Sequence, residues 1–112
     1  MKEVFIYLEN GYADWEISLI GSQVTSSNKY VVKYVAKTKD PVISMSGLRI
    51  LPDGSAEDVV NSDISQSAML VLCGGMYWSE ANFINEEAKK LVDLFLKNNK
   101  PVAAICDATA FL

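Results

Sequence analysis

The pattern of apolar positions along the chain predicts four strands that are buried on both faces. Each is a short apolar run with little polar alternation, as is typical of the inner strands of a parallel sheet. The four runs cover residues 3–8, 30–36, 69–73 and 101–105. We therefore expect these strands to lie side by side in one mainly parallel sheet.

Two amphipathic helices are predicted between these strands. Apolar residues recur at helical spacing over residues 13–24, and again over residues 86–96. Asn85 can cap the second helix and Pro101 follows its end, as expected for helix boundaries. Strands that alternate with helices in this order predict a three-layer α/β fold.

Smaller elements are predicted between the second and third strands. Residues 42–51 are divided by Ser46-Gly47 and indicate a hairpin, which a turn at residues 52–55 closes. Residues 55–58 then open a short helical turn. No internal repeat, low-complexity segment or linker divides the sequence, so we expect a single domain over residues 1–112.

Composition narrows the classes of function. Half of the residues are hydrophobic, which is enough for a packed core, and the net charge is −4. No run of basic residues indicates binding to nucleic acid or to an anionic membrane surface. The first apolar run, residues 4–8, is too short for a signal peptide or a membrane span, so we expect a cytoplasmic protein.

The chain contains two cysteines and no histidine. Two cysteines are too few for a disulfide framework, and in the cytoplasm we expect both to be free thiols. The lack of histidine excludes Ser-His-Asp triads, Cys-His dyads and nearly all zinc patterns within the 112 residues. We expect neither a metal nor another cofactor.

Cys106 is the residue whose local pattern indicates chemistry. It ends the last apolar strand, and the small residues Ala104 and Ala108 lie two positions before and after it. This spacing is typical of a nucleophile elbow, in which a strand turns at once into a helix and exposes a strained residue. The helix start would favour the thiolate. From the spacing alone, an inert buried cysteine at a strand end remains an alternative.

The segment after the third predicted strand contains a glycine pair, Gly74-Gly75, followed by aromatic residues. The role of each can be interpreted in two ways. The glycine pair predicts either a tight turn after a strand or a place where a ligand approaches the backbone. It lacks the longer glycine-rich pattern of a phosphate-binding loop. The segment Met76-Tyr77-Trp78 is interpreted as an exposed loop that either forms a pocket wall or makes a dimer contact.

Four segments together resemble signatures of the ThiJ/PfpI family, within the class I glutamine amidotransferase-like superfamily. They occur in the family's order over essentially the whole chain: NGYADWE, LPDGSAEDV, LVLCGG and AAIC. The resemblance implies a three-layer α/β/α flavodoxin-like sandwich with a mainly parallel sheet. It also implies a reactive cysteine at the elbow and, usually, a homodimer.

The resemblance implies site residues position by position. Cys106 matches the family's reactive cysteine, and Glu16 matches the glutamate that reaches this cysteine from the first helix. Gly75 and the backbone N–H of Asp107 match the site that holds an oxyanion. A protonated carboxyl at Glu16 can donate a hydrogen bond to a thiolate, so the two groups would titrate as a pair. Without the family, Glu16 is a solvated residue of the first helical turn.

The chain departs from the family's pattern in three ways. Cys73 stands where the family usually has proline, and we interpret it as a small buried hydrophobe. Asp107 stands where the family often has a small residue or a histidine, and its charge opposes an adjacent thiolate. Family members are usually longer, with a catalytic histidine later in the chain. We therefore expect an incomplete, N-terminal portion of the fold that ends just after the elbow and leaves an uncovered hydrophobic edge.

Three functions are open from the sequence. The first is a cysteine-dependent enzyme acting through Cys106, either a hydrolase of the protease or amidase type or a glyoxalase-like enzyme for small aldehydes. The second is a non-catalytic stress or redox-sensing protein, in which Cys106 is oxidised to a sulfinate held by Glu16. The third is a ligand-sensing or structural domain with an inactive site. The expected partner is a small carbonyl or amide substrate, with no nucleic acid and no membrane.

Overall fold

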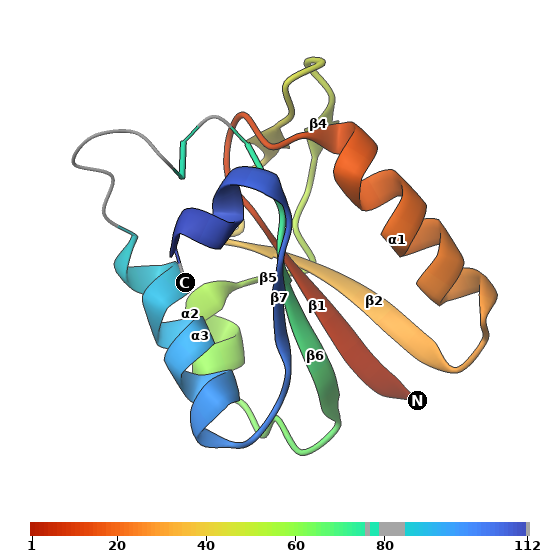
Figure 1. The fold of residues 1–112 in the computed structure, drawn as a ribbon, viewed down its shortest axis with the longest axis vertical. Coiled ribbons are helices and arrows are strands. Elements are labelled where there is room, and N and C mark those ends of the chain that lie inside the picture. Colours follow the sequence, from red (N-terminus) through yellow and green to blue (C-terminus); the bar gives the residue numbers. More distant parts are fainter. Residues whose placement is uncertain (76, 79–84, 112) are drawn as a thin grey trace.

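The computed structural model describes residues 1–75, 77–78 and 85–111, and these form a three-layer α/β sandwich (Figure 1). Among the described residues, five parallel strands form the central sheet in the order β5-β2-β1-β6-β7. They are β1 (Lys2–Leu8), β2 (Tyr30–Ala36), β5 (Gly54–Ser55), β6 (Ser67–Leu72) and β7 (Val102–Ala104). A separate antiparallel hairpin consists of β3 (Val42–Ile43) and β4 (Arg49–Ile50).

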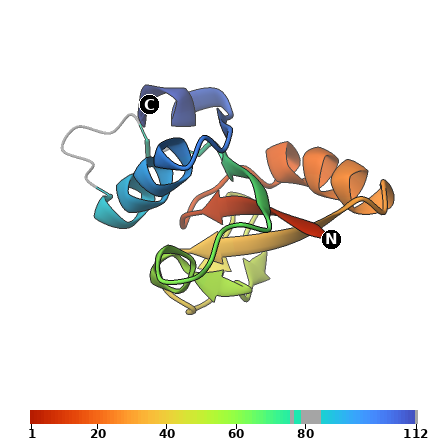
Figure 2. The same cartoon turned by 90° about the horizontal axis from the view of Figure 1, so that it is seen from below.

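Helices cover both faces of the sheet. The helix α1 (Asp14–Ser26) lies on one face, whereas α2 (Ala56–Val60) and α3 (Glu86–Lys97) lie on the other (Figure 2). Asn85 caps α3 by accepting a hydrogen bond from the Ala88 N–H at 2.9 Å, as the sequence predicted. The predicted three-layer α/β fold is therefore confirmed.

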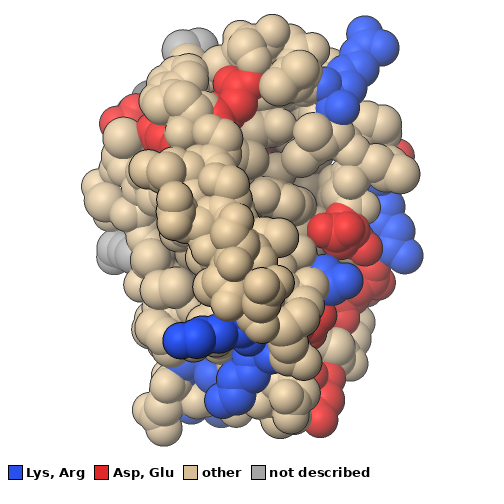
Figure 3. Space-filling view, turned by 90° about the vertical axis from the view of Figure 1, so that its right-hand side faces the viewer, with Lys and Arg blue, Asp and Glu red and all other residues tan. Residues whose placement is uncertain are grey.

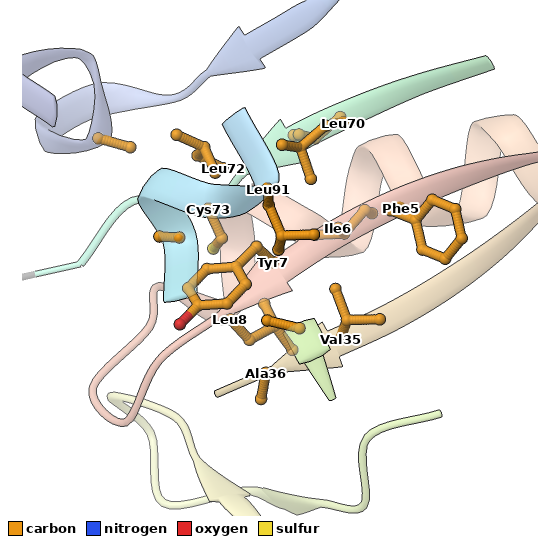
Figure 4. Packing of buried hydrophobic residues seen from close by; sticks show 14 of the residues in the cluster. Phe5, Ile6, Tyr7, Leu8, Val35, Ala36, Leu70, Leu72, Cys73 and Leu91 are labelled. Atoms are coloured by element: carbon orange, nitrogen blue, oxygen red, sulfur yellow. The ribbon is translucent and has the colours of Figure 1, made fainter. Parts of the chain in front are cut away.

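The hydrophobic core lies on both sides of β1, the central strand (Figure 4). Residues 4–8 are all buried, which is what their uninterrupted apolar pattern predicted. Phe5 packs edge-to-face against Phe95 of α3, with the ring centroids 6.1 Å apart. Because β1, β6 and β7 are parallel, their carboxyl ends lie at one edge of the sheet, where ligands bind in open α/β folds.

The helix α1 approaches the sheet closely at Gly21. A Cβ at this position would collide with the hydroxyl of Tyr34 on β2, so glycine permits the contact. On its outer side, α1 leaves Trp15 and Leu19 exposed, at 63% and 67% of their full accessibility. Uncharged side chains cover a broad central area on the side of the molecule that α1 and β2 occupy (Figure 3).

The four predicted strands are confirmed, but the sheet has a fifth strand that the sequence analysis missed. The strand β5 lies in residues 52–55, which were predicted to form only a turn. The Asp53 N–H donates to the Tyr34 carbonyl oxygen at 2.7 Å, and the Asp53 carboxylate accepts from the Tyr34 N–H at 2.8 Å. These bonds join the turn to β2. Because no apolar pattern accompanies them, the sequence did not predict this strand. The hairpin within residues 42–51 and the helical turn that begins near residue 55 are confirmed.

Candidate active site

Cys106 follows the end of β7 and has a left-handed backbone conformation, with a φ of 51°. This conformation is uncommon for residues other than glycine and costs conformational energy. The Cys106 side chain is exposed, whereas Ala108, two positions later, is fully buried. The backbone therefore has the form of an elbow, and the alternative of a buried cysteine at this position is wrong.

The helix after the elbow differs from the regular helix that the sequence indicated. Residues Cys106–Phe111 form a 3₁₀ helix, η1. The Ala108 N–H donates to the Ile105 carbonyl oxygen at 3.1 Å, and the Thr109 hydroxyl donates to the Cys106 carbonyl oxygen at 2.8 Å. These two bonds hold the tight turn that presents the Cys106 thiol.

Glu16 reaches the elbow from the first turn of α1. Its Oε1 accepts a hydrogen bond from the Gly74 N–H at 2.9 Å, and its side chain also hydrogen-bonds to Cys106. This hydrogen bond, followed by the charge of the carboxylate, raises the pKa of the Cys106 thiol; burial and Asp107 add smaller effects. The pKa of Cys106 is thus shifted opposite to the direction that a helix start alone would give. Glu16 is not a solvated residue of the first helical turn.

Gly74 allows the Glu16 side chain and Cys106 to lie close together. This role of Gly74 was not predicted from the sequence. A Cβ on Gly74 would lie 2.8 Å from the Ile105 carbonyl oxygen and 3.1 Å from the Cys106 Cβ, and it would collide with Glu16. Only glycine lets the three groups come together here. The Gly74-Gly75 pair after a strand indicated that some group approaches the backbone closely at this place. The sequence did not show which group it is.

A hollow of about 150 Å³ opens beside the Cys106 thiol. It is lined by Ala13, Trp15, Glu16, Met45, Gly75, Cys106 and Asp107. The four residues predicted for the site, Glu16, Gly75, Cys106 and Asp107, therefore lie around one hollow. Pockets for drug-sized ligands measure roughly 300–1,000 Å³, so this hollow suits a smaller molecule.

Asp14 ties the hairpin to α1 beside this hollow. Its Oδ2 accepts hydrogen bonds from the Ser46 hydroxyl and, at 2.7 Å, from the Ser44 hydroxyl. These two bonds, that of Ser46 first, lower the pKa of Asp14. Met45 lies between the two serines and lines the hollow. No pattern in the sequence indicated this cluster, which holds one wall of the site in place.

The aromatic residues after Gly75 belong to the core rather than to an exposed surface. Tyr77 and Trp78 are both buried, and both donate to the Cys73 carbonyl oxygen, the former at 3.2 Å and the latter at 2.7 Å. The prediction of an exposed aromatic loop is wrong for these two residues, because each side chain buries its ring while its polar atom finds a backbone partner. Met76 lies outside the described residues.

Comparison with known proteins agrees with the geometry of the fold. The family model described as the DJ-1/PfpI family matches residues 2–112, nearly the whole chain. The chain belongs to the DJ-1/PfpI family. The resemblance to ThiJ/PfpI proteins that the sequence motifs indicated is therefore confirmed.

Two curated relatives of this DJ-1/PfpI chain differ from it in length. A protein of Bacillus subtilis (strain 168), described as uncharacterized protease YdeA, is 28% identical over 113 residues that cover 100% of this chain and 53% of the relative. An uncharacterized protein of Archaeoglobus fulgidus is 33% identical over 109 residues, which cover 97% of this chain and 62% of the relative. The chain thus spans less than two thirds of either relative.

Solved structures of the family share the fold. The DJ-1 superfamily protein Atu0886 from Agrobacterium tumefaciens superposes with a TM-score of 0.83 at 29% identity, over 99% of this chain and 57% of that protein. The thiJ/pfpI family protein from Bacillus anthracis gives a TM-score of 0.73 at 29% identity, over 96% and 52%. Both likenesses support the α/β fold of the described residues.

Cys73 is the second cysteine of this DJ-1/PfpI chain, and it is buried without exposure. Its Sγ lies 3.3 Å from the Gly74 carbonyl oxygen and 3.6 Å from that of Ala13. Burial, followed by the charge of Glu16, raises the pKa of Cys73 to about 12. The interpretation of Cys73 as a small buried hydrophobe is confirmed.

The part of the chain that the structure describes has neither a membrane-spanning helix nor a group of side chains that could hold a metal ion. None of its helices is long and apolar enough to cross a membrane. Within residues 1–75, 77–78 and 85–111, no group of three or more His, Cys, Asp or Glu side chains is placed to hold a metal ion.

Proposed function

We propose that this DJ-1/PfpI protein is a cysteine-dependent enzyme in which Cys106 attacks a small carbonyl compound. The observation that carries the proposal is the position of Glu16, which the Gly74 N–H holds at 2.9 Å and which lines one hollow with Cys106. The Cys106 side chain is exposed there, at a turn with a φ of 51°. A nucleophile that touches a group able to take its proton is the usual arrangement for covalent catalysis. The relative YdeA is described as a protease, which is consistent with a carbonyl target.

In the proposed first step, the thiol proton passes to Glu16 and the Cys106 sulfur forms a bond to the carbonyl carbon. The π electrons of the C=O bond move to the oxygen, which becomes an oxyanion. Gly75 and Asp107 line the same hollow, and their backbone N–H groups would donate to this oxygen. The proton held by Glu16 then passes to the oxyanion, which completes the addition.

Small aldehydes suit this site better than amides. An amide releases its amine only after the nitrogen gains a proton, so its cleavage needs a leaving-group step in addition to the attack by the thiol. An aldehyde adds the thiol without a leaving group. With an α-oxoaldehyde, Glu16 can then move the C–H proton of the adduct to the adjacent carbonyl carbon, while the hydroxyl proton of the adduct passes to the oxygen of that carbonyl, which gives a thioester. Water cleaves the thioester to a 2-hydroxy acid and regenerates the thiol, so this glyoxalase-like reaction needs no external oxidant.

Redox sensing at the same residue is the alternative function, and the exposure of Cys106 favours it. A thiolate that takes one oxygen atom from each of two hydrogen peroxide molecules becomes a sulfinate and releases two waters. A protonated Glu16 could donate a hydrogen bond to this sulfinate.

Turnover assays of wild type, Cys106→Ser and Glu16→Gln with an α-oxoaldehyde and with a small amide test the proposal. We expect the aldehyde to be consumed, Cys106→Ser to abolish this activity, and Glu16→Gln to lower it by about 10²-fold to 10⁴-fold. Glu57→Gln, at an exposed position of α2, is the matched control and should not change the rate.

The proposal is contradicted if neither carbonyl compound is turned over. In that case, conversion of Cys106 to a sulfinate by hydrogen peroxide, followed by mass spectrometry, would support redox sensing. A Cys106 that stays unmodified by peroxide would contradict the alternative as well.

A further inference from the structure

Two carboxylates and no cationic side chain line the described walls of the hollow beside Cys106. Glu16 and Asp107 supply the carboxylates. Apart from Cys106 itself, the other side chains that line it are apolar: Ala13, Trp15 and Met45. The residues that the structure does not describe, 76, 79–84 and 112, include no Lys or Arg in the sequence. The charged groups that this chain brings to the lining of the hollow are therefore negative.

The carboxylate of Asp107 has no part in the reaction proposed above. The proposed oxyanion contact uses only the backbone N–H of Asp107. Its side chain is exposed beside the thiol, and its charge acts on Cys106 in the same direction as that of Glu16. A charged group at this place changes how readily any charged reagent approaches the sulfur.

We propose that the Asp107 and Glu16 carboxylates select the electrophiles that Cys106 attacks, admitting neutral and cationic molecules and repelling anionic ones. The inference rests on the proposed function, because it names the class of substrate for the same cysteine: small carbonyl compounds that are uncharged or cationic. Carbonyl compounds that carry a carboxylate, such as 2-oxo acids, should react more slowly than neutral compounds of similar size. A 2-hydroxy acid product is itself an anion, so the same charges favour its release.

The Asp107 and Glu16 carboxylates should change the reaction rate of Cys106 with an anionic reagent only modestly, because water and salt screen exposed charges. A carboxylate that lines the same hollow as the sulfur slows the approach of an anionic reagent by about threefold to tenfold in solvent-exposed surroundings. Salt should weaken the selection, since the screening length falls from about 10 Å at 0.1 M to about 3 Å at 1 M ionic strength.

Alkylation by two reagents of similar size and different charge tests the selection. Iodoacetamide is neutral and iodoacetate is anionic; with either, the thiolate sulfur bonds to the CH₂ carbon and iodide leaves with the electrons of the C–I bond. Peptide mass spectrometry follows Cys106 separately from Cys73. The ratio of the two rate constants, divided by the same ratio for 2-mercaptoethanol, removes the intrinsic difference between the reagents.

We expect this normalised ratio to favour iodoacetamide by about tenfold at low salt and to fall toward one at 1 M salt. Asp107→Asn should reduce the preference by about threefold, while circular dichroism confirms that the fold is kept. Asp93→Asn, at an exposed position of α3, is the matched control and should keep the wild-type ratio. A wild-type ratio near one, or a ratio that Asp107→Asn leaves unchanged, would overturn the proposal.

These measurements separate charge selection from the proposed enzyme activity, because alkylation needs no turnover. A large ratio without turnover of any carbonyl compound would contradict the proposed function while supporting charge selection at Cys106. Turnover of a neutral aldehyde together with a normalised ratio near one would contradict charge selection alone.

Discussion

At the scale of the single residue, the reactivity of Cys106 depends on the neighbouring Glu16 carboxyl. Glu16 is held by the Gly74 N–H and hydrogen-bonds to Cys106. A carboxylate in this position stabilises the neutral thiol, which is why the pKa of Cys106 is raised. Replacement of Glu16 should therefore change the pKa of Cys106.

Glu16→Gln removes the carboxylate charge while keeping the shape of the side chain. We expect the pKa of Cys106 to fall, because the largest cause of its elevation is removed. Alkylation follows the thiolate fraction, so the rate profile of the variant should move to lower pH. Ultraviolet thiolate absorbance against pH measures the shift. If the pKa of Cys106 instead rises in the variant, Glu16 must act as a neutral donor to the thiolate.

Limited labelling with iodoacetamide should modify Cys106 before Cys73. Cys106 is exposed, whereas Cys73 is buried and its pKa is raised to about 12. We expect the two rates to differ by at least about 10²-fold at neutral pH, because both access and thiolate fraction favour Cys106. Peptide mass spectrometry resolves the two sites. Preferential modification of Cys73 would refute the assignment of Cys106 as the reactive thiol.

At the scale of the elements, the site is assembled where the carboxyl ends of β6 and β7 meet the first turn of α1 and the hairpin. Cys106 follows β7, Gly74 follows β6, and Glu16 comes from α1. The hairpin contributes Met45 through the bonds from its serines to Asp14. The position of each group is therefore set by a different element, and the close contact at Gly74 joins them.

Gly74→Ala should disturb both the fold and the site. The added Cβ would meet the Ile105 carbonyl oxygen and the Cys106 Cβ and would collide with Glu16, so we expect a loss of about 1–3 kcal/mol in the free energy of unfolding. Gly54→Ala is the control, because its Cβ would only touch Asp58 at 3.7 Å. Urea unfolding measures both variants. Equal stability of Gly74→Ala and wild type would show that the contact at Gly74 is loose in solution.

Apolar runs and helical spacing were enough to predict the four longer strands of the sheet, the long helices and the hairpin. They did not reveal β5, since the two residues of this strand join the sheet through backbone bonds around Asp53 rather than through an apolar pattern. Tyr77 and Trp78 were misplaced for a related reason. Their burial depends on the Cys73 carbonyl oxygen, a tertiary partner that local sequence does not show.

The candidate site was predicted by two kinds of argument. Small residues around Cys106 indicated an elbow from local spacing alone, and the structure gives this residue a positive φ. Glu16 is far from Cys106 in the sequence, so only the family resemblance paired the two. The role of Gly74 could not be predicted from the sequence, because every residue except proline has a backbone N–H that can donate such a hydrogen bond.

At the scale of the whole molecule, apolar surface remains uncovered on the described part of the chain. Trp15 and Leu19 of α1 are exposed, and Met45 and Leu48 beside the hairpin are also exposed. Such surfaces favour association. We therefore propose that the protein forms a homodimer through the face that α1 occupies (Figure 3).

Leu19→Lys should weaken this homodimer. The side chain is exposed at 67%, so the substitution should leave the fold intact while placing a charge in the proposed interface. Leu96→Lys on α3, where the leucine is exposed at 56%, is the matched control. Light scattering during size-exclusion chromatography measures the mass of each species. A wild-type monomer, or equal effects of the two variants, would contradict the proposed interface.

The central claim, that Cys106 is the nucleophile of a carbonyl-directed enzyme, is tested most directly by comparing loss of activity with modification of this residue. Iodoacetamide should abolish turnover of the α-oxoaldehyde with the same rate constant at which mass spectrometry records carbamidomethylation of Cys106, and the aldehyde should slow both processes equally. Turnover that persists after Cys106 is fully carbamidomethylated would contradict the account.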